Sequence, residues 1–457
     1  MRFTNTLTRQ QEEFKPQGDV VTMYVCGITP YDDSHIGHAM SYVVFDVLKR
    51  YLLWRGYRVK HVQNFTDIDD RIIERANRLG ISTGDLVQRY IDAYMADMRD
   101  LNVLPADEYP HATREIPDMI HMIEGLVDNG FAYVAPSQQS EYSDVYYRVS
   151  AKDDYGKLSH RTQESLLAGA RVESGEQKEN PADFALWKGA KAGEPSWDSP
   201  WGKGRPGWHI ECSAMSLRYL GERIDIHGGG EDLIFPHHEN EIAQSEAYTG
   251  VAPFVRYWLH NAWVKMGEEK MSKSLGNFIT IRDGLKAVGG DGLRLWILTS
   301  HYRKPLTFTE ETLEAAKQGA ARLRTAARAP SEEGDGGIDL AAMRERFIAA
   351  MDDDLNTPQA LAVLFDLAKE LNRARDEGRG GHVAQALLFE LADVLGLRLE
   401  AIQEAIEAAP FIELLVQIRS ELRTAKQWAL SDRIRDGLAA LSIALEDTPQ
   451  GTTWKPD

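Results

Sequence analysis

Two histidines near the start of the chain, His35 and His38, flank Gly37 in PYDDSHIGHAM, residues 30–40. Histidines three residues apart can share one face of a helix, where they would suit a metal ion. Their ring N–H groups can also donate hydrogen bonds to phosphate oxygens, and the same spacing occurs by chance on surface loops. The spacing alone leaves these three interpretations open.

The elements around this histidine pair favour phosphate. VVTMYVCG (20–27) is apolar and β-branched like a buried strand, residues 39–56 carry apolar side chains at helical spacing, and RVKHVQNF (58–65) predicts a second strand. Strand, glycine turn, helix and strand make a βαβ unit, which implies a parallel sheet. At such a turn the unpaired backbone N–H groups and the helix dipole favour an anion, and Gly37 allows it to approach closely.

A second phosphate-binding candidate is KMSKS (270–274), which places Lys270 and Lys273 on a glycine-flanked loop. Two lysines with two serines can cover a polyphosphate and move away afterwards. Because such clusters are common on surfaces, the motif is specific only in combination with the histidine turn. GKGRPG (202–207) has the letters of a dinucleotide fingerprint, but no apolar strand precedes it, and the common G-x-x-x-x-G-K-[ST] phosphate loop is absent.

The chain has only two cysteines, Cys26 and Cys212, and both lie near other candidate metal ligands. In FPHHENE, His237 and Glu241 are four residues apart on one helix face, and His238 with Glu241 is the alternative pair. Two thiolates, one imidazole and one carboxylate suit Zn²⁺, although each cysteine alone is more often a small buried hydrophobe. Four protein ligands normally indicate a closed structural zinc site.

Composition narrows the class of protein. With 457 residues, 43% of them hydrophobic and 27% charged, the chain is typical of a globular protein of about three domains. Two cysteines do not make a disulfide scaffold, and no apolar run approaches a membrane span or a signal core, so we expect a cytoplasmic protein. The net charge of −18 argues against a protein that coats nucleic acids in general and requires any basic surface to be local. Arg294–Lys304 and Arg419–Arg435 are candidates for it, and both segments also have structural roles.

The two motifs and the blocks around them resemble the class I aminoacyl-tRNA synthetases, and in detail the cysteinyl-tRNA synthetase family. The resemblance covers nearly the whole chain and is weakest at 130–200 and 310–400. The matching blocks, in the family's order, are MYVCGITPYDDSHIGHA, NFTDIDD, GWHIECSAMS, HGGGEDLIFPHHENEIAQSEA, EKMSKSLGN and LEDTPQGTTW. This resemblance implies ATP-dependent activation of L-cysteine to cysteinyl-adenylate and its transfer to tRNA(Cys). We also expect a monomer that does not bind a membrane.

The resemblance also implies roles for individual residues. One Zn²⁺ per chain would be bound by Cys26, Cys212, His237 and Glu241, with the substrate thiolate as an additional ligand, and Mg²⁺ would arrive with ATP. The catalytic residues would be His35, His38, Lys270 and Lys273. ATP would be bound by these four together with Gly27, Thr29, Gly37, Gly230 and Asp232. The cysteine substrate would be bound by Cys26, Thr66 and Trp208, and the anticodon by Trp428, Asp432 and Asp447.

The expected fold class is α/β, with a split Rossmann-type parallel-sheet catalytic domain, an inserted domain and a helical C-terminal tRNA-binding part. The two catalytic halves are predicted at 1–110 and 201–257, around an inserted connective domain at 111–200. The remaining parts are a KMSKS-loop stem-contact region at 258–308, a helical bundle at 309–405 and an anticodon-binding domain at 406–457.

Three other functions compete with this hypothesis. GITPYD resembles the version found in the cysteine ligases of mycothiol synthesis, which activate cysteine in the same way but pass it to an amino sugar. Against that alternative stands the helical C-terminal third, which a small-molecule ligase does not need. A non-catalytic tRNA-binding paralogue would be expected to lose signature residues that are present here. A zinc-stabilised scaffold would leave both phosphate motifs unexplained.

Overall fold

The computed structural model describes residues 1–161, 177–267, 269–270, 278–400, 408–441, 443–448 and 451–456. These residues form two compact units, Met1–Leu399 and Glu400–Asp457. The second unit therefore begins before the boundary predicted at 406. None of the described helices is both long and apolar enough to cross a membrane.

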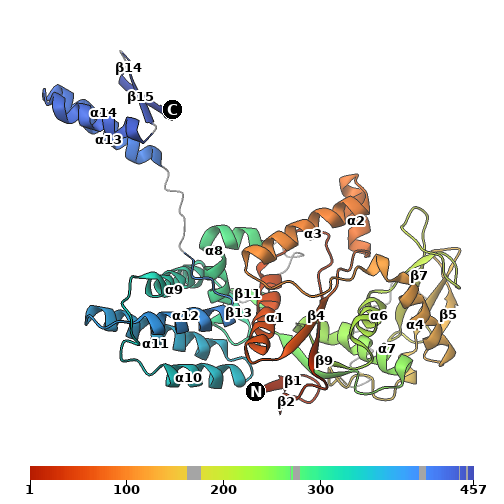
Figure 1. Ribbon diagram of the computed structural model, residues 1–457. Coiled ribbons are helices and arrows are strands. Elements are labelled where there is room, and N and C mark those ends of the chain that lie inside the picture. The colour runs from red at the N-terminus through yellow and green to blue at the C-terminus, as the bar shows by residue number, and fades with distance from the viewer. Residues whose placement is uncertain are drawn as a thin grey trace. The chain divides into compact units, whose positions relative to one another are not determined.

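A four-stranded parallel sheet with strand order β10–β9–β3–β4 forms the centre of the first unit (Figure 1). Its strands are β3 (Val20–Val25), β4 (Arg58–Gln63), β9 (Ile224–Gly230) and β10 (Val255–Asn261). From β3 the chain passes through helix α1 (Ile36–Trp54) to β4 on one side, whereas β9 and β10 lie on the other side. The strand order thus reverses between β3 and β9, and open α/β sheets bind ligands outside the carboxyl ends of their strands at such a point.

Successive side chains of strand β3 point to the two opposite faces of the parallel sheet. Met23 and Val25 belong to the core shared with α1 and the helical bundle, whereas Tyr24 and Cys26 belong to the core on the opposite face. Alternation along a strand produces this division. It directs Cys26 toward the helices of the second catalytic half, where Cys212 lies in the same core.

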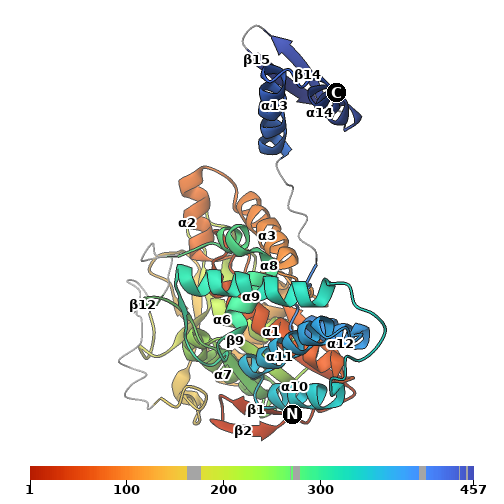
Figure 2. The ribbon, with the colours of Figure 1, turned by 90° about the vertical axis from the view of Figure 1, so that its left-hand side faces the viewer.

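Helices cover both faces of the sheet, as the two views in Figures 1 and 2 show. On the side of Cys26 the core includes α4 (Ile116–Asp128), α6 (Trp208–Leu220) and α7 (Glu239–Thr249). The opposite core includes α1 and α3 (Thr83–Asp100), while α2 (Asp70–Leu79) contributes to both. A short hairpin of β1 (Arg2–Asn5) and β2 (Gln10–Glu13) precedes the sheet.

The inserted region forms a four-stranded antiparallel sheet of its own. Its strands, in order, are β5 (Ala132–Pro136), β6 (Ser143–Tyr147), β7 (Phe184–Gly189) and β8 (Gly204–Pro206). Strand β8 carries the insertion past the boundary predicted at 200. GKGRPG therefore forms β8 and the turn into α6, not a nucleotide loop after a parallel strand. Gly207 is required in this turn, since a Cβ there would lie 2.0 Å from the Ala185 carbonyl oxygen.

The remainder of the first unit is mainly helical. A small sheet of β12 (Glu269–Lys270), β11 (Val264–Met266) and β13 (Leu306–Phe308) accompanies α8 (Ile281–Leu298). The helices that follow are α9 (Glu310–Arg328), α10 (Leu340–Asp352), α11 (Thr357–Asp376) and α12 (His382–Val394). Thr309 and Asn356 cap α9 and α11 by accepting backbone N–H groups, as short polar N-cap residues do.

The second unit combines two helices with a hairpin. It contains α13 (Ala408–Thr424), α14 (Trp428–Ala440), β14 (Ile443–Thr448) and β15 (Gly451–Pro456), the two strands being antiparallel. Arg419 is 1% exposed and binds Asp447 through both terminal nitrogens, at 2.8 and 2.9 Å. This ion pair joins α13 to β14.

Candidate active site and metal centre

Four potential metal ligands converge at the carboxyl end of β3. Cys26 follows this strand, Cys212 comes from α6, and His237 and Glu241 come from the turn before α7 and its first turn. Their ligand atoms all lie within 4.8 Å of one another, and all four residues are buried. The Cys26 Sγ atom is 3.9 Å from Cys212 Sγ and 3.8 Å from Glu241 Oε1, and His237 Nε2 is 3.0 Å from Glu241 Oε1.

A second arrangement of ligands shares part of this cluster. Cys26 and Glu241 also lie within 4.8 Å of His227 and His238, with His238 Nε2 3.2 Å from Cys26 Sγ. The first arrangement brings together both thiols, whereas the second offers only one. Because soft thiolates favour Zn²⁺, the donor chemistry favours the set that contains His237.

Three histidines that the sequence analysis missed surround these ligands. His209 Nδ1 lies 2.9 Å from His237 Nδ1, and His260 Nε2 lies 2.7 Å from His238 Nδ1. His227 Nε2 lies 2.8 Å from Glu241 Oε2. Such outer partners orient metal ligands and fix their tautomers. His227 on β9 and His260 on β10 reach the ligands through the strand order, which no local spacing signals. His209 lies three residues before Cys212 on α6, and this helical spacing could have indicated it.

Burial and mutual charge set the protonation of the cluster. The hydrogen bond from Cys26 lowers the pKa of Cys212 to about 6, whereas burial raises the pKa of Cys26 well above its usual value. Burial opposes the effect of the Glu241 charge on His237, but the charge prevails and raises the pKa of His237 to about 10. Burial likewise opposes the influence of His227 and His237 on Glu241, whose pKa is nevertheless lowered. A thiolate and a carboxylate are the forms that bind a cation.

The histidine turn lies a few residues beyond Cys26, at the start of α1. His35 is the N-cap of α1, and its Nδ1 accepts the backbone N–H of His38, while His38 Nδ1 accepts that of His35. Since each Nδ1 is an acceptor, the proton of each neutral ring lies on Nε2, which is then a donor. Gly37 lies in the first turn of this helix.

The chain that follows the KMSKS motif runs beside this turn. His35 forms an isolated backbone bridge with Thr280, and the Ile36 N–H donates to the Ile279 carbonyl at 3.0 Å. Of the two predicted lysines, Lys270 ends β12, and Lys273 lies outside the described residues. The structure therefore brings the flank of the predicted loop to His35.

A cavity of about 560 Å³ opens beside the metal-ligand cluster. Trp208, His209 and Glu211 line it from α6, and Asp69 and Arg205 line it from other elements. The Trp208 ring is 37% exposed and stacks on His237, with the ring centroids 4.3 Å apart. Thus the predicted substrate-side tryptophan contacts a candidate metal ligand and also faces the cavity.

The predicted substrate residues Gly27 and Thr66 meet at the ends of β3 and β4. A Cβ at Gly27 would lie 1.5 Å from the Asn64 carbonyl oxygen, so only glycine fits this close approach. The Gly27 N–H donates to Asn64 Oδ1 at 3.0 Å, and Asn64 Nδ2 donates to the Thr66 hydroxyl at 3.3 Å. Sequence analysis missed Asn64, which precedes the predicted Thr66 by two residues.

The remaining predicted nucleotide residues lie at neighbouring strand ends. Thr29 follows β3 and accepts a hydrogen bond from Arg71 at 3.3 Å. Gly230 ends β9, and Asp232 lies in the short helical turn Glu231–Leu233 that follows. These residues lie at or just after the carboxyl ends of β3 and β9, the two adjacent strands between which the strand order reverses.

Known proteins match this chain over its whole length. Residues 13–318 match the family model described as tRNA synthetases class I (C) catalytic domain, and residues 346–400 match a DALR domain. The chain is 57% identical to cysteine–tRNA ligase of Dehalococcoides mccartyi, with 100% of this chain and 99% of that protein covered. It is 52% identical to cysteine–tRNA ligase of Symbiobacterium thermophilum, again with 100% and 99% covered.

The chain belongs to the cysteine–tRNA ligase family. Solved structures share its fold at low identity. Methionyl-tRNA synthetase of Mycobacterium tuberculosis aligns with a TM-score of 0.59 at 16% identity, over 83% of this chain and 90% of that one. A putative arginyl-tRNA synthetase from Campylobacter jejuni gives 0.53 at 14%, over 85% and 92%.

Membership of the cysteine–tRNA ligase family confirms the predicted enzyme class and the α/β fold with its parallel sheet. The full-length matches do not favour the mycothiol-type ligase or the non-catalytic paralogue. The DALR match likewise accounts for part of the helical C-terminal third that a small-molecule ligase would not need.

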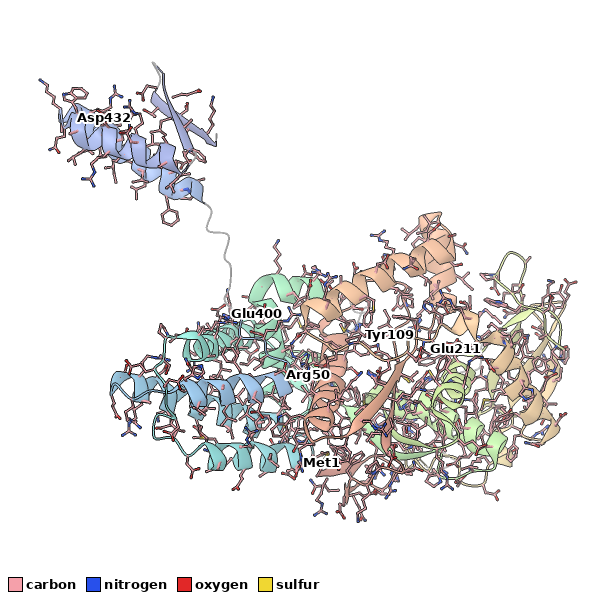
Figure 3. All side chains as sticks on the ribbon, viewed as in Figure 1. Met1, Arg50, Tyr109, Glu211, Glu400 and Asp432 are labelled. Atoms are coloured by element: carbon pink, nitrogen blue, oxygen red, sulfur yellow. The ribbon has the colours of Figure 1, made fainter. Side chains whose placement is uncertain are left out.

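The predicted anticodon residues of this cysteine–tRNA ligase family member differ in their surroundings. Trp428 is 56% exposed at the start of α14, and Asp432 lies one turn later on the same helix (Figure 3). Asp447 accepts hydrogen bonds from Arg419, Arg423 and Thr452. The hydrogen bond from Arg419 lowers the pKa of Asp447. Its carboxylate therefore stabilises the unit internally.

Two residues of the predicted basic surfaces are buried. Arg294 is completely buried and donates to Asp46 at 2.5 Å and to the Leu395 carbonyl, and Arg419 is held by Asp447. These guanidinium groups cannot contact a phosphate backbone. The structural role expected for parts of both segments therefore applies to these two arginines, and any basic surface must come from the other lysines and arginines of the two segments.

Proposed function

We propose that the chain activates L-cysteine with ATP and transfers the cysteinyl group to tRNA(Cys). In the first step the cysteine carboxylate attacks the α-phosphate of ATP, which forms cysteinyl-adenylate and releases pyrophosphate. In the second step a hydroxyl of the terminal adenosine of the tRNA attacks the cysteinyl carbonyl and releases AMP. The observation that carries this proposal is that a thiol-rich cation site and a phosphate-type turn follow the same strand, β3.

The cation site is proposed to select the amino acid. Cys26, Cys212, His237 and Glu241 would hold one Zn²⁺, as the convergence of both thiols with an imidazole and a carboxylate supports. Bound there, zinc would supply a soft Lewis acid that favours a thiolate over a hydroxyl or a methyl group. Contacts with the wall of an apolar cavity alone would distinguish two amino acids whose side chains differ by one group by only about 1–3 kcal/mol. Trp208 limits the space in front of the site.

The histidine turn is proposed to bind the nucleotide. Because Nδ1 of His35 and of His38 caps the helix, both rings present an Nε2 donor toward an anion at the positive end of α1. Donors of this kind neutralise charge that develops on the pentacoordinate α-phosphate. Mg²⁺ would accompany ATP, and Lys270 and Lys273 would cover the phosphates from the loop.

The tRNA is proposed to contact the second unit through Trp428 and Asp432. An exposed tryptophan can stack on an unpaired base, and a carboxylate can accept from a base amine. The boundaries of the KMSKS-loop region at 258–308, the monomeric state and the cytoplasmic location remain predictions from the sequence.

Cysteine-dependent ATP–pyrophosphate exchange tests this function, with serine as the matched control amino acid. We expect exchange with cysteine and at least 10³-fold less with serine, because a hydroxyl is a poor zinc ligand. Charging of a tRNA(Cys) transcript tests the second step. Exchange that does not depend on cysteine would contradict the proposal.

A further inference from the structure

Residues 152–161 of the inserted region form a strap along α7, the helix whose first turn supplies the candidate metal ligand Glu241. Near the other end of this helix, Lys152 and Lys157 both form ion pairs with the Glu246 carboxylate, at 3.0 and 2.6 Å. The Glu246 side chain is buried, and the two ion pairs fasten the first half of the strap to α7.

The strap is also fastened at the amino end of α7. The Glu239 carboxylate, which is 1% exposed, accepts the backbone N–H groups of Leu158 at 3.1 Å and of Ser159 at 2.8 Å. The Tyr155 hydroxyl donates a hydrogen bond to Asn240 Oδ1, on the next residue of the helix. Contacts at both ends of α7 therefore hold the strap against the helix.

The end of the strap covers the turn before α7, which carries the candidate ligand His237. The Arg161 guanidinium lies over the Phe235 ring, 4.3 Å from its centroid. Phe235 has extended backbone angles, so this turn is not part of a regular helix, and its shape depends on contacts with neighbouring segments. Leu158 is buried in the same core as the two candidate thiol ligands. The strap thus packs beside every element of the metal-ligand cluster.

The strap also forms part of the wall of the cavity beside the metal ligands. Tyr155 and Arg161 line this cavity together with Asn240 and Phe235, the residues that they contact. A substrate that enters the cavity toward the ligands would lie against the strap. Displacement of the strap would therefore alter the ligand-bearing turn and the cavity together.

Glu239 makes no other hydrogen bond among the described residues. It is the first residue of α7 and lies two positions before Glu241. The two strap N–H groups are the donors to its carboxylate in this part of the chain. Removal of the acceptor would leave both N–H groups without a partner, which is costly in a buried position. The strap would then separate from the ligand-bearing turn.

We infer that Glu239 is a positioning residue for the proposed metal site and acts through the strap. The strap holds the turn with His237 and the first turn of α7 in place, which slows the loss of the cation. It also keeps the ligands in the arrangement that distinguishes a thiol from a hydroxyl. This inference rests on the proposed function and gives the inserted region a part in it.

The first test measures the release of zinc from the zinc-loaded full chain. Zinc that leaves the protein is followed by the colour of its complex with 4-(2-pyridylazo)resorcinol. We expect Glu239→Ala to raise the rate of release about 10- to 100-fold. Glu239→Gln keeps an oxygen that can accept the two N–H groups, so its rate should stay within about threefold of the wild-type rate. A glutamine variant as fast as the alanine variant would overturn the inference, because the charge at the start of α7 would then matter and not the strap.

Asp225→Ala is the matched control for Glu239→Ala. Asp225 is also a carboxylate that is 1% exposed, and it accepts the backbone N–H groups of Gln17 and Thr22. It lies near the amino end of β9, away from the ligands at the carboxyl end of β3. Its replacement should lower the unfolding temperature about as much as Glu239→Ala does, but leave the rate of zinc release unchanged. Equal acceleration of zinc release in both variants would reflect a general loss of stability and overturn the inference.

Tyr155→Phe is a milder variant that keeps the inference testable if Glu239→Ala folds poorly. It removes only the hydroxyl that binds Asn240 and should raise the rate of zinc release about 3- to 10-fold. Added to Glu239→Ala, it should cause little further increase, since both residues fasten the same strap. An unchanged rate in Tyr155→Phe, or increases that multiply in the double variant, would contradict a shared action through the strap.

The preference for cysteine over serine in ATP–pyrophosphate exchange is the second readout. With zinc in excess, Glu239→Ala should lower this preference about 10-fold or more, whereas Asp225→Ala should leave it unchanged. An unchanged preference in Glu239→Ala would exclude the strap from substrate selection. Failure of the proposed function has different signatures, namely a wild-type chain that binds no zinc or shows no cysteine-dependent exchange.

Discussion

The rings of His35 and His38 stack with their centroids 3.8 Å apart, and each Nδ1 accepts the backbone N–H of the other residue. The pair thus forms a reciprocal helix cap that fixes the tautomer of both rings. A single interaction accounts for both the start of α1 and the orientation of two donors.

This relationship predicts that capping and catalysis can be separated at His38. In His38→Asn the side-chain oxygen can still accept a backbone N–H, but the Nε2 donor is lost. We expect kcat for pyrophosphate exchange to fall about 10²- to 10³-fold, with little change in the Michaelis constant for cysteine.

The control for this prediction is His38→Ala, which loses both the donor and the cap. It should show the same kinetic loss and, in addition, a free energy of unfolding lower by about 1 kcal/mol. If His38→Asn retained wild-type kcat, the histidine turn would serve only to cap α1.

Zinc content is expected to distinguish His237 from His238. The ligand set that contains His237 also contains both thiols, so we expect it to bind the zinc ion. His237→Ala should therefore reduce the zinc content from about one ion per chain to a small fraction of that after dialysis. His238→Ala removes an imidazole that contacts His260, so it should weaken zinc binding by only about 10- to 100-fold. Metal analysis after equilibration with a competing chelator measures both, and the reverse order would assign the site to the His227 and His238 arrangement.

The sequence predicted the framework of the site because that framework is local. Periodicity within residues 20–65 encodes the strand that precedes Cys26, the helix after the glycine turn and the second strand, which form β3, α1 and β4. Likewise 208–250 forms α6, β9 and α7. Strand order, in contrast, is not a local property, and it is the order β10–β9–β3 that brings His227 and His260 to the cysteines.

Side-chain pairing was equally beyond the sequence. An arginine is usually a surface cation, yet Arg294 is buried against Asp46, a partner far away in the chain.

The boundary of the insertion was also beyond sequence analysis. The three-residue strand β8 has too few residues for an alternating pattern, so the end of the insertion could not be located. Lys270 and Lys273 were predicted from their motif, and their roles stay predictions.

Replacements of Trp428 and of Asp447, two of the three predicted anticodon residues, should have different effects. Asp447→Asn leaves the Arg419 guanidinium buried without its counter-charge, so the second unit should lose about 2 kcal/mol of stability. Trp428→Ala removes an exposed ring and should leave stability nearly unchanged, but raise the Michaelis constant for tRNA about 10-fold or more.

Urea unfolding of the full chain, followed at a probe in the second unit, measures the first effect, and tRNA charging kinetics measure the second. Glu446→Gln is a suitable control, because the ion pair of Glu446 with Lys455 lies on the surface and contributes little. A stable Asp447→Asn variant with impaired charging would instead favour direct base contact by that carboxylate.

Stability should fall in mild acid because of His61 on β4. The ring is 5% exposed and neither of its nitrogens has a hydrogen-bond partner among the described residues. Burial lowers its pKa to about 3, assisted by Lys49 and opposed by Asp107. Because this pKa lies below the unfolded value of about 6.5, the folded chain binds fewer protons than the unfolded chain below pH 6.5. The contribution to stability is complete above pH 6.5 and is lost as the pH falls toward 3.

His61 should therefore account for about 2 kcal/mol of the stability lost between pH 6.5 and pH 5. Replacing it by leucine removes the titrating group and two unsatisfied nitrogens, so His61→Leu should flatten this part of the stability profile. The exposed His382 provides the control substitution His382→Leu, which should leave the slope as it is. Urea denaturation midpoints of the three proteins at pH 7.5, 6.5 and 5 measure the difference. Parallel profiles for wild type and His61→Leu would show that the His61 ring is already accommodated in its charged form.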